Sequence, residues 1–263
     1  MAGVRYLVIQ MTHLSTLPEG NGVAVVSGGA QGLGRAFVRR LAELGHDVAV
    51  LDLQDATEIA AEMHGLGRRF LVMRGDAADP RVVDEFARDV REGLGPPRVL
   101  VNNVGISPYR AFSDETLDSW HEVLRVNLDS AFLLTRAFLP DLCTTGSGRV
   151  VNLTSSVVWD AATRDMVAYA TSKAAIVGLT RALATELGPA GVTVNAIAPG
   201  IVLTPDIQAR VPEEKLAAYR DRQAIKELAG PDDLTAALGF LVSPGAQQVT
   251  GVVLPVNGGR VWT

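Results

Sequence analysis

The sequence has a single cysteine, Cys143, among its 263 residues. No disulfide can therefore form within the chain, and a lone thiol fits the reducing cytoplasm, where we expect the protein to act. The four histidines, His13, His46, His64 and His121, lack the spacing of metal ligands, so we expect no metal site. Acidic residues outnumber basic ones by 29 to 24, and the net charge of −5 argues against nucleic acid as a partner.

The first twenty residues carry no pattern of a secretory signal or a membrane anchor. Their apolar stretch, residues 6–9, is too short for either, and no small-residue cleavage site follows it. We therefore expect no membrane contact. Residues 1–20 are interpreted as an N-terminal extension, and two explanations stay open. Either residues 1–10 precede a natural start at Met11, or the extension is a strand or arm that packs on a neighbouring subunit.

Residues 21–263 have the composition and pattern of one α/β domain. The whole chain is 48% hydrophobic and 20% charged, which suffices for one large core. Short apolar runs alternate with longer stretches of helical periodicity, and this order predicts a doubly wound parallel sheet, the Rossmann fold. Helices are predicted at 80–93, 116–142, 168–187 and 232–242, and a last strand at 252–255.

A glycine-rich turn connects the first strand of this domain to its first helix. Residues 23–26 are apolar, residues 27–34 read Ser-Gly-Gly-Ala-Gln-Gly-Leu-Gly, and residues 35–44 show helical spacing before Gly45. This order of elements places the pyrophosphate of a dinucleotide on backbone N–H groups at a helix N-terminus. The sequence therefore predicts a dinucleotide site.

The next strand, residues 47–51, ends at Asp52, 18 residues beyond Gly34. A carboxylate there can accept hydrogen bonds from the adenosine ribose, and it would repel a 2′-phosphate. No basic residue precedes Gly32 in the loop, although Arg35, just past the glycines, could swing towards a phosphate. These features favour NAD over NADP; the alternative is a solvated aspartate in a turn.

Tyr169 and Lys173 are four residues apart, so on a helix they share a face with Cβ atoms roughly 5–6 Å apart. A unit charge about 4 Å away, at an effective dielectric of ~20, supplies on the order of 4 kcal/mol. Lowering a tyrosine pKa by two or three units takes roughly 3–4 kcal/mol. Lys173 alone is therefore expected to bring the pKa of Tyr169 close to neutrality. An isolated pair of this kind is more often a surface contact, but the neighbouring motifs favour catalysis.

Together these motifs resemble those of the short-chain dehydrogenase/reductase family, in the branch with a Tyr-x-x-x-Lys site. The resemblance runs from Gly22 to Gly259 and includes a family-like Asn-Asn-Val-Gly at 102–105. It departs from the family at Asn257, where aspartate is common. The resemblance implies a cofactor site made of Ser27, Gly28, Gln31, Gly32, Leu33, Gly34, Asp52, Asp76, Ala77, Asn103, Gly105, Tyr169, Lys173, Pro199, Gly200, Val202 and Thr204.

The same resemblance implies four catalytic residues, Asn127, Ser156, Tyr169 and Lys173. Tyr169 would transfer the proton to or from the substrate oxygen, and Lys173 would stabilise the phenolate and hold the nicotinamide ribose. Ser156 would donate a hydrogen bond to the substrate oxygen, and Asn127 would anchor a water that links Lys173 to solvent. Ser156 is preferred over Ser155 because it precedes Tyr169 by the family's 13 positions. A shift of one residue, to Ser155, stays open.

Substrate residues are expected in 106–112, in 157–166 and in a lid segment at about 204–223. Tyr109, Trp159 and Met166 in the first two would suit an apolar or aromatic alcohol, although Trp159 could simply pack its loop. Local phrases resemble NAD-dependent dehydrogenases of aryl secondary alcohols and of pyridoxal. We therefore expect hydride transfer between NAD and a small secondary alcohol or ketone. The alternatives are an NADPH-dependent 3-oxoacyl-thioester reductase and an idle NAD-binding sensor.

The long central helices resemble those that build the family's four-helix subunit interfaces. This resemblance implies a homotetramer, with a dimer as the alternative. Periodicity alone distinguishes neither.

Overall fold

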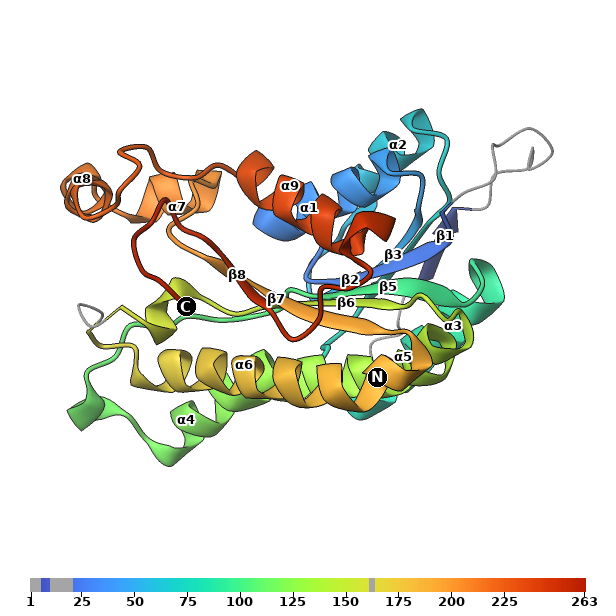
Figure 1. Ribbon diagram of the computed structural model, residues 1–263, viewed down its shortest axis with the longest axis horizontal. Coiled ribbons are helices and arrows are strands. Elements are labelled where there is room, and N and C mark those ends of the chain that lie inside the picture. The colour runs from blue at the N-terminus through green and yellow to red at the C-terminus, as the bar shows by residue number, and fades with distance from the viewer. Residues whose placement is uncertain (1–5, 10–20, 161–163) are drawn as a thin grey trace.

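The computed structural model describes residues 6–9, 21–160 and 164–263 (Figure 1). The strands of these residues form one sheet in the order β1-β4-β3-β2-β5-β6-β7-β8. Strands β2 to β8 are parallel to one another, which confirms the predicted doubly wound parallel sheet, and β1 is antiparallel to β4. The strands are β1 (Tyr6–Ile9), β2 (Val23–Ser27), β3 (Asp47–Asp52), β4 (Phe70–Arg74), β5 (Pro97–Asn102), β6 (Arg149–Leu153), β7 (Thr193–Pro199) and β8 (Val253–Val256).

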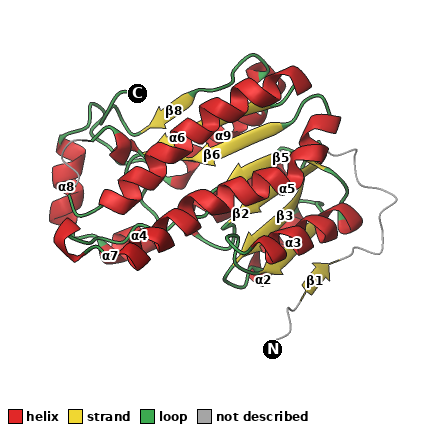
Figure 2. Ribbon diagram, turned by 90° about the horizontal axis from the view of Figure 1, so that it is seen from below, coloured by secondary structure: helices red, strands yellow, loops and turns green. Residues whose placement is uncertain are grey.

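Helices cover both faces of the sheet. Helices α1, α2 and α9 lie on one face, and α3, α5 and α6 lie on the other, with α4 beside α6 (Figures 1 and 2). Helices α7 and α8 lie beyond the carboxyl ends of the strands. The helices are α1 (Gly32–Glu43), α2 (Thr57–Gly65), α3 (Pro80–Gly93), α4 (Leu117–Leu124), α5 (Ser130–Thr144), α6 (Val167–Leu187), α7 (Pro205–Arg210), α8 (Glu213–Asp221) and α9 (Pro231–Val242).

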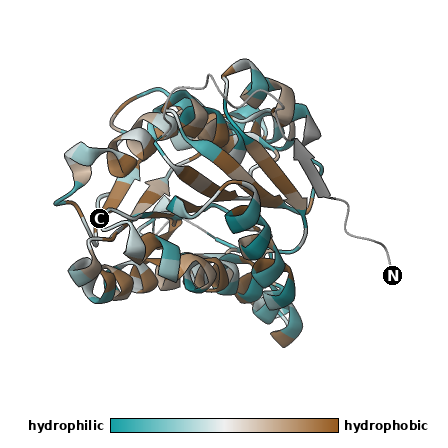
Figure 3. Cartoon of the chain, turned by 90° about the vertical axis from the view of Figure 1, so that its right-hand side faces the viewer, coloured by the Kyte–Doolittle hydropathy of each residue, from teal (hydrophilic) through white to brown (hydrophobic). Residues whose placement is uncertain are grey.

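Alternate residues of the central strands supply two hydrophobic cores. In β2, Ala24 and Val26 belong to the core beneath α1 and α9, whereas Val23 and Val25 belong to the core beneath α3 and α5. A parallel strand buried on both faces needs such a continuous apolar run, because helices cover it from either side. Figure 3 shows the apolar strands enclosed between helices that carry both hydrophilic and hydrophobic residues.

The strand order reverses at β2, which has β3 on one side and β5 on the other. Connections that leave β2 and β5 turn to opposite faces, so a crevice opens at their carboxyl ends, where ligands of this fold class bind. Ser27 and Asn102 lie side by side at these ends. The loops that follow them therefore flank the crevice.

Three predicted helices are confirmed within one residue, as α3, α6 and α9, and the predicted last strand is β8, shifted by one residue. The helix predicted at 116–142 divides into α4, a π-helical turn at Arg125–Asp129 and α5. A π turn accommodates one extra residue per turn and often marks a functional site. Here it contains Asn127.

Part of the N-terminal extension is an edge strand of the chain's own sheet. Strand β1 pairs with β4 from Tyr6 opposite Met73 to Ile9 opposite Phe70. Residues 1–5 and 10–20, including Met11, lie outside the described part of the chain. Within that part, no helix combines the length and apolar character needed to span a bilayer.

Gly34 marks the closest approach of α1 to the loop after β2. A Cβ at this position would lie 1.9 Å from the Gly28 carbonyl oxygen and 2.7 Å from Nδ2 of Asn103. We expect Gly34→Ala to lower the free energy of unfolding by about 1–3 kcal/mol, since the clash involves backbone. Gly178→Ala is the matched control, because a Cβ there meets nothing within 4 Å. Urea denaturation compares the two; equal stability of both variants would contradict the close approach.

Candidate active site

A cleft of about 1050 Å³ lies at the carboxyl ends of β2 to β5 and is lined by most of the predicted cofactor residues. A smaller hollow of about 150 Å³ adjoins it and is lined by Tyr169, Lys173 and Pro199. Leu33, Asn103 and Gly105 line both. The predicted residues on the large cleft are Gly28, Gln31, Gly32, Leu33, Gly34, Asp52, Asp76, Ala77, Asn103, Gly105 and Thr204.

The glycine loop has the shape required to hold a pyrophosphate. Gly32 begins α1 with φ +54°, and a Cβ there would face open space, with its nearest neighbour 4.0 Å away. Gln31 gives the first turn of α1 no side-chain cap, and this turn contains no acidic residue. The N–H groups of the helix N-terminus are therefore available to an anion that approaches over Gly32.

Ser27 supports this loop without lining the cleft. Its hydroxyl accepts a hydrogen bond from the Asn103 backbone N–H (3.0 Å), and the Asn103 side chain donates to the carbonyl oxygens of Ser27 (3.1 Å) and Gly28 (2.9 Å). These bonds join the two loops of the crevice. The predicted Ser27 and Asn103 are thus structural partners at the strand-order reversal.

Asp52 presents a carboxylate fixed at the far end of the cleft. It accepts hydrogen bonds from the backbone N–H groups of Ala30 and Gln54, both at 2.9 Å. Arg35 and Arg39 line the same cleft, but both form ion pairs with Glu62. Both arginines are therefore engaged by the same carboxylate.

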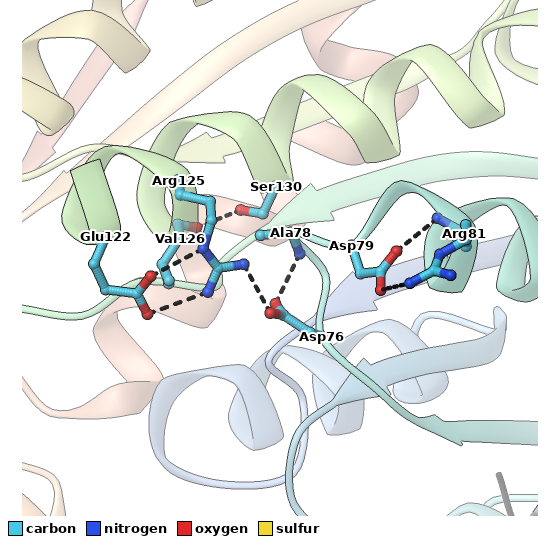
Figure 4. A network of polar contacts seen from close by, with 8 residues as sticks. All are labelled: Asp76, Ala78, Asp79, Arg81, Glu122, Arg125, Val126 and Ser130. Atoms are coloured by element: carbon cyan, nitrogen blue, oxygen red, sulfur yellow. Dashed lines mark hydrogen bonds and ion pairs between the residues drawn. The ribbon is translucent and has the colours of Figure 1, made fainter. Parts of the chain in front are cut away.

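Asp76 belongs to a network of charges that sequence reasoning missed (Figure 4). Its carboxylate accepts from the Ala78 N–H (2.9 Å) and from Nη1 of Arg125 (2.8 Å). Arg125 also pairs with Glu122, and its hydrogen bonds with Glu122 and Asp76 raise the pKa of Arg125 above its ordinary value. Arg125 and Glu122 both line the cleft. The one feature of the sequence that could have indicated Arg125 and Glu122 is their position just before Asn127.

Asn127 is buried, and its side-chain amide is fully engaged. Nδ2 donates to the Ile106 carbonyl and to the Ser172 hydroxyl, both at 2.9 Å, and Oδ1 accepts from the Ile106 N–H at 2.7 Å. A Cβ added to Gly105 would lie 3.2 Å from Nζ of Lys173 and 3.3 Å from Oδ1 of Asn127. The amide of Asn127 and the ammonium of Lys173 thus converge on Gly105, and the predicted water link remains a prediction.

Lys173 and Tyr169 lie near the start of α6, with Nζ of Lys173 5.9 Å from the phenol ring centroid. Nζ donates to the Leu153 carbonyl at 2.8 Å. Burial lowers the pKa of Lys173 to about 8. Burial also raises the pKa of Tyr169, which a hydrogen bond with Ser155 only partly offsets. The expectation that Lys173 alone brings the pKa of Tyr169 towards neutrality is therefore wrong in direction, because desolvation by burial is the largest cause of the shift.

The two serines occupy different positions from those predicted. Ser155 hydrogen-bonds the Tyr169 phenol, whereas the Ser156 hydroxyl lies 3.4 Å from the Tyr219 hydroxyl on α8. Strand β6 ends at Leu153, and a 3-10 turn begins at Ser156, so the backbone is no longer extended there. The structure thus brings Ser155, and not Ser156, to Tyr169.

The segment after β7 is divided between the two hollows and the core. Pro199 lines the smaller hollow, and Thr204 lines the cleft while its hydroxyl caps α7 through the Ile207 N–H. Gly200 and Val202 line neither hollow. A Cβ at Gly200 would lie 2.9 Å from the Tyr219 hydroxyl, and Val202 is buried.

Comparison with known proteins identifies the family. A family model described as "Enoyl-(Acyl carrier protein) reductase" matches residues 28–260. The short-chain dehydrogenase/reductase eriH of Hericium erinaceus is 36% identical over 247 residues, which is 91% of this chain and 98% of that protein. This chain is a short-chain dehydrogenase/reductase.

Other members extend the comparison to chemistry and structure. The 3-oxoacyl-[acyl-carrier-protein] reductase FabG of Pseudomonas aeruginosa is 33% identical, over 90% of this chain and 96% of that protein. A blue fluorescent protein from a metagenomic library, solved with NADPH, superposes with a TM-score of 0.87 at 32% identity, covering 92% of this chain and 99% of its own. The chain is accordingly an oxidoreductase of this family that binds a nicotinamide cofactor.

The predicted cofactor residues and the predicted catalytic pair are neighbours in this structure. The glycine loop and Asp52 line the cleft. Tyr169 and Lys173 line the adjoining hollow. Of the described residues, no group of three His, Cys, Asp or Glu side chains is arranged to hold a metal ion.

Lys173→Met should stabilise the protein at pH 7. The lysine pKa is about 8 in the fold, against about 10.4 when unfolded. Stability is therefore lowered most below pH 8, and this penalty fades as pH rises to about 10.4. We expect Lys173→Met to raise the free energy of unfolding at pH 7 by about 1–3 kcal/mol.

Urea titrations at pH 7 and at about pH 10.5 measure the effect, with exposed Lys215→Met as the matched control. The control should change stability little at either pH. A less stable Lys173→Met protein at pH 7 would show that the buried ammonium stabilises the fold.

Proposed function

We propose that the protein is an NAD(H)-dependent dehydrogenase/reductase of a small, apolar or aromatic secondary alcohol and its ketone. The observation that carries the proposal is that Tyr169, the hydrogen-bond partner of Ser155, and Lys173 line the hollow that adjoins the cofactor cleft. A phenol with a hydroxyl partner and a nearby cation can bind an alcohol oxygen and exchange a proton with it.

A nicotinamide cofactor held in the cleft would supply the hydride acceptor or donor, and the protein handles the proton. Tyr169 takes the alcohol proton during oxidation and returns it during reduction. Ser155 donates a hydrogen bond to the substrate oxygen and so orients it towards Tyr169. Lys173, held by the Leu153 carbonyl, favours the phenolate when it is charged.

The raised pKa of Tyr169 gives the two directions opposite pH dependence. At neutral pH the buried phenol is protonated, which suits the reduction of a ketone. Oxidation needs the phenolate, so its rate should increase through the alkaline range. The lowered pKa of Lys173 works against this increase, since the lysine loses its charge above about 8.

The choice of NAD over NADP is supported by charge. Asp52 lines the cleft with a fixed carboxylate, while Arg35 and Arg39 are paired with Glu62. A 2′-phosphate would therefore meet a negative charge, while the arginines that line the cleft, Arg35, Arg39 and Arg125, are all held in ion pairs. The metagenomic relative binds NADPH, and a candidate NAD(P)-dependent gluconate 5-dehydrogenase from Beutenbergia cavernae, 38% identical, binds NADP; our proposal sets this chain apart from both.

The substrate class is supported by apolar side chains around the hollow. Ile106 lines both the cleft and the hollow, and Tyr109 and Phe112 follow it in an exposed loop. Trp159 packs against the small core cluster of Val177, Ala196, Ala198 and Val253, so its loop-packing role is the better supported one. A 3-oxoacyl-thioester reductase is the second candidate, favoured by the similarity to the Pseudomonas reductase.

We further propose a cytoplasmic homotetramer without nucleic acid or membrane partners. Its support is the apolar outer surface of the long helices, where Leu117 of α4, Phe132 of α5 and Val167 of α6 are exposed. Burial of such side chains between subunits is favourable.

Asp52→Asn should shift the cofactor preference towards NADP. The amide removes the negative charge, and its single oxygen can keep only one of the two backbone bonds, from Ala30 or from Gln54. We expect about a tenfold loss of kcat/KM with NAD, as for a lost charged hydrogen bond, together with a gain for NADP. Asp52→Ala is the comparison without acceptors, and an unchanged cofactor ratio in both variants would exclude ribose recognition by Asp52.

Ser155→Ala and Tyr169→Phe should each lower turnover by about 10²–10⁴-fold while NAD binding is retained. Ser156→Ala is the matched control and should stay close to wild type. The assay follows NADH formation from aliphatic, aryl and hydroxysteroid secondary alcohols at mildly alkaline pH, with NADP and acyl-thioester reduction in parallel. A greater loss in Ser156→Ala than in Ser155→Ala would restore Ser156 as the catalytic serine, and full activity of Tyr169→Phe would exclude the proposed mechanism.

A further inference from the structure

The turn after β8 packs against the end of the lid segment. This segment comprises residues 204–223 and contains α7 and α8. Asn257 shapes this turn, since its Oδ1 accepts from the N–H groups of Gly259 (3.0 Å) and Arg260 (3.1 Å). The Gly258 carbonyl accepts from the Ile225 N–H at 2.8 Å. A Cβ at Gly258 would lie 2.3 Å from Nε2 of Gln223, so only glycine fits there.

Arg260 extends from this turn and joins two elements that are distant in sequence. Its side chain is 4% exposed, and Nε and Nη2 donate to the same carboxylate oxygen of Asp160 at 2.9 and 2.7 Å. Its guanidinium lies 4.7 Å from the ring centroid of Tyr219 on α8. Figure 1 shows the C-terminal segment, in dark red, between α8 and the turn that follows β6.

Tyr219 carries this connection into the active site. Its hydroxyl is 3.4 Å from the Ser156 hydroxyl, and a Cβ at Gly200 would lie 2.9 Å from it. Ser156 follows Ser155, which hydrogen-bonds Tyr169. The ring of Tyr219 therefore contacts Arg260, while its hydroxyl reaches the segment that carries the active-site serine.

We propose that Arg260 is a positioning residue that holds Tyr219, and α8 with it, against the substrate side of the active site. The proposal rests on the proposed oxidoreductase function for its effect on substrate. The geometry suits arginine because a planar guanidinium can pair with a carboxylate at its edge and stack on a ring with its face. Arg222 also approaches Asp160, but at 3.8 Å and with a side chain that is 55% exposed.

Arg260→Met tests this role in steady-state kinetics. We expect KM for the alcohol to rise about tenfold, from loss of the cation–π contact and of the ordered lid, with kcat changed far less. The Kd for NADH, measured by fluorescence, should be unchanged, because neither Arg260 nor Tyr219 lines the cofactor cleft. Arg260→Lys keeps the charge and should recover part of the KM.

Two substitutions at Tyr219 separate the ring from the hydroxyl. Tyr219→Phe keeps the ring beside Arg260 and should retain a KM near wild type. Tyr219→Leu removes the ring while Arg260 and Asp160 stay paired, so it should reproduce the KM of Arg260→Met even if that variant fails to fold. Arg81→Met, at an arginine with a side chain 92% exposed on α3, is the matched control.

Hydrogen exchange tests the lid without any turnover. Amides of residues 205–223 should exchange faster in Arg260→Met and Tyr219→Leu, with the sheet unchanged. Unchanged exchange there would overturn the proposal, as would faster exchange with an unchanged KM. If no alcohol is oxidised by the wild type, the proposed function fails, and the exchange data then decide alone whether Arg260 holds α8.

Discussion

The burial of the Lys173 ammonium group is the constraint on which this active site depends. Its Nζ is enclosed between α6 and the carboxyl end of β6, with the Leu153 carbonyl as its acceptor, beside the bare backbone of Gly105. Withdrawing a charge from water is costly unless partners replace the solvent. The same enclosure raises the pKa of Tyr169, so one cause shifts both groups towards their neutral forms. A ligand that brings a charge into the hollow can therefore shift the pKa values of both Tyr169 and Lys173.

The crevice at the strand-order reversal supplies the rest of the site with rigid supports. Ser27 and Asn103 join its two loops, and Asp52 is fixed by two backbone N–H groups. Asn103 and Asp52, which both line the cleft, are thus held by backbone groups of neighbouring segments. Such preorganisation lowers the entropy lost when a dinucleotide binds. The loop after β5 lines both the active-site hollow and the cofactor cleft. A contact that fixes this loop on one side therefore also fixes it on the other.

The parts of the fold and site that follow local rules could be predicted from the sequence. Apolar runs and helical spacing identified most of the central strands and long helices, and the glycine loop, Asp52, Tyr169 and Lys173 stand in short motifs. What failed depends on contacts between distant residues. Ser155 replaces Ser156 beside Tyr169 because β6 ends before the serines, and the Tyr169 pKa rises because other elements bury it. Arg125 reaches Asp76 across 49 residues and Arg260 reaches Asp160 across 100, which no local pattern reveals.

The π-helical turn between α4 and α5 determines in which direction the side chains of each helix point. Each residue of an α-helix advances the chain by about 100° around its axis. The extra residue in Arg125–Asp129 therefore allows Asn127 to point at the loop after β5 while Phe138, further along, still points into the core. Deleting one residue here would give a more regular helix in which only one of these two side chains could keep its direction. Length in this segment is consequently as constrained as residue identity.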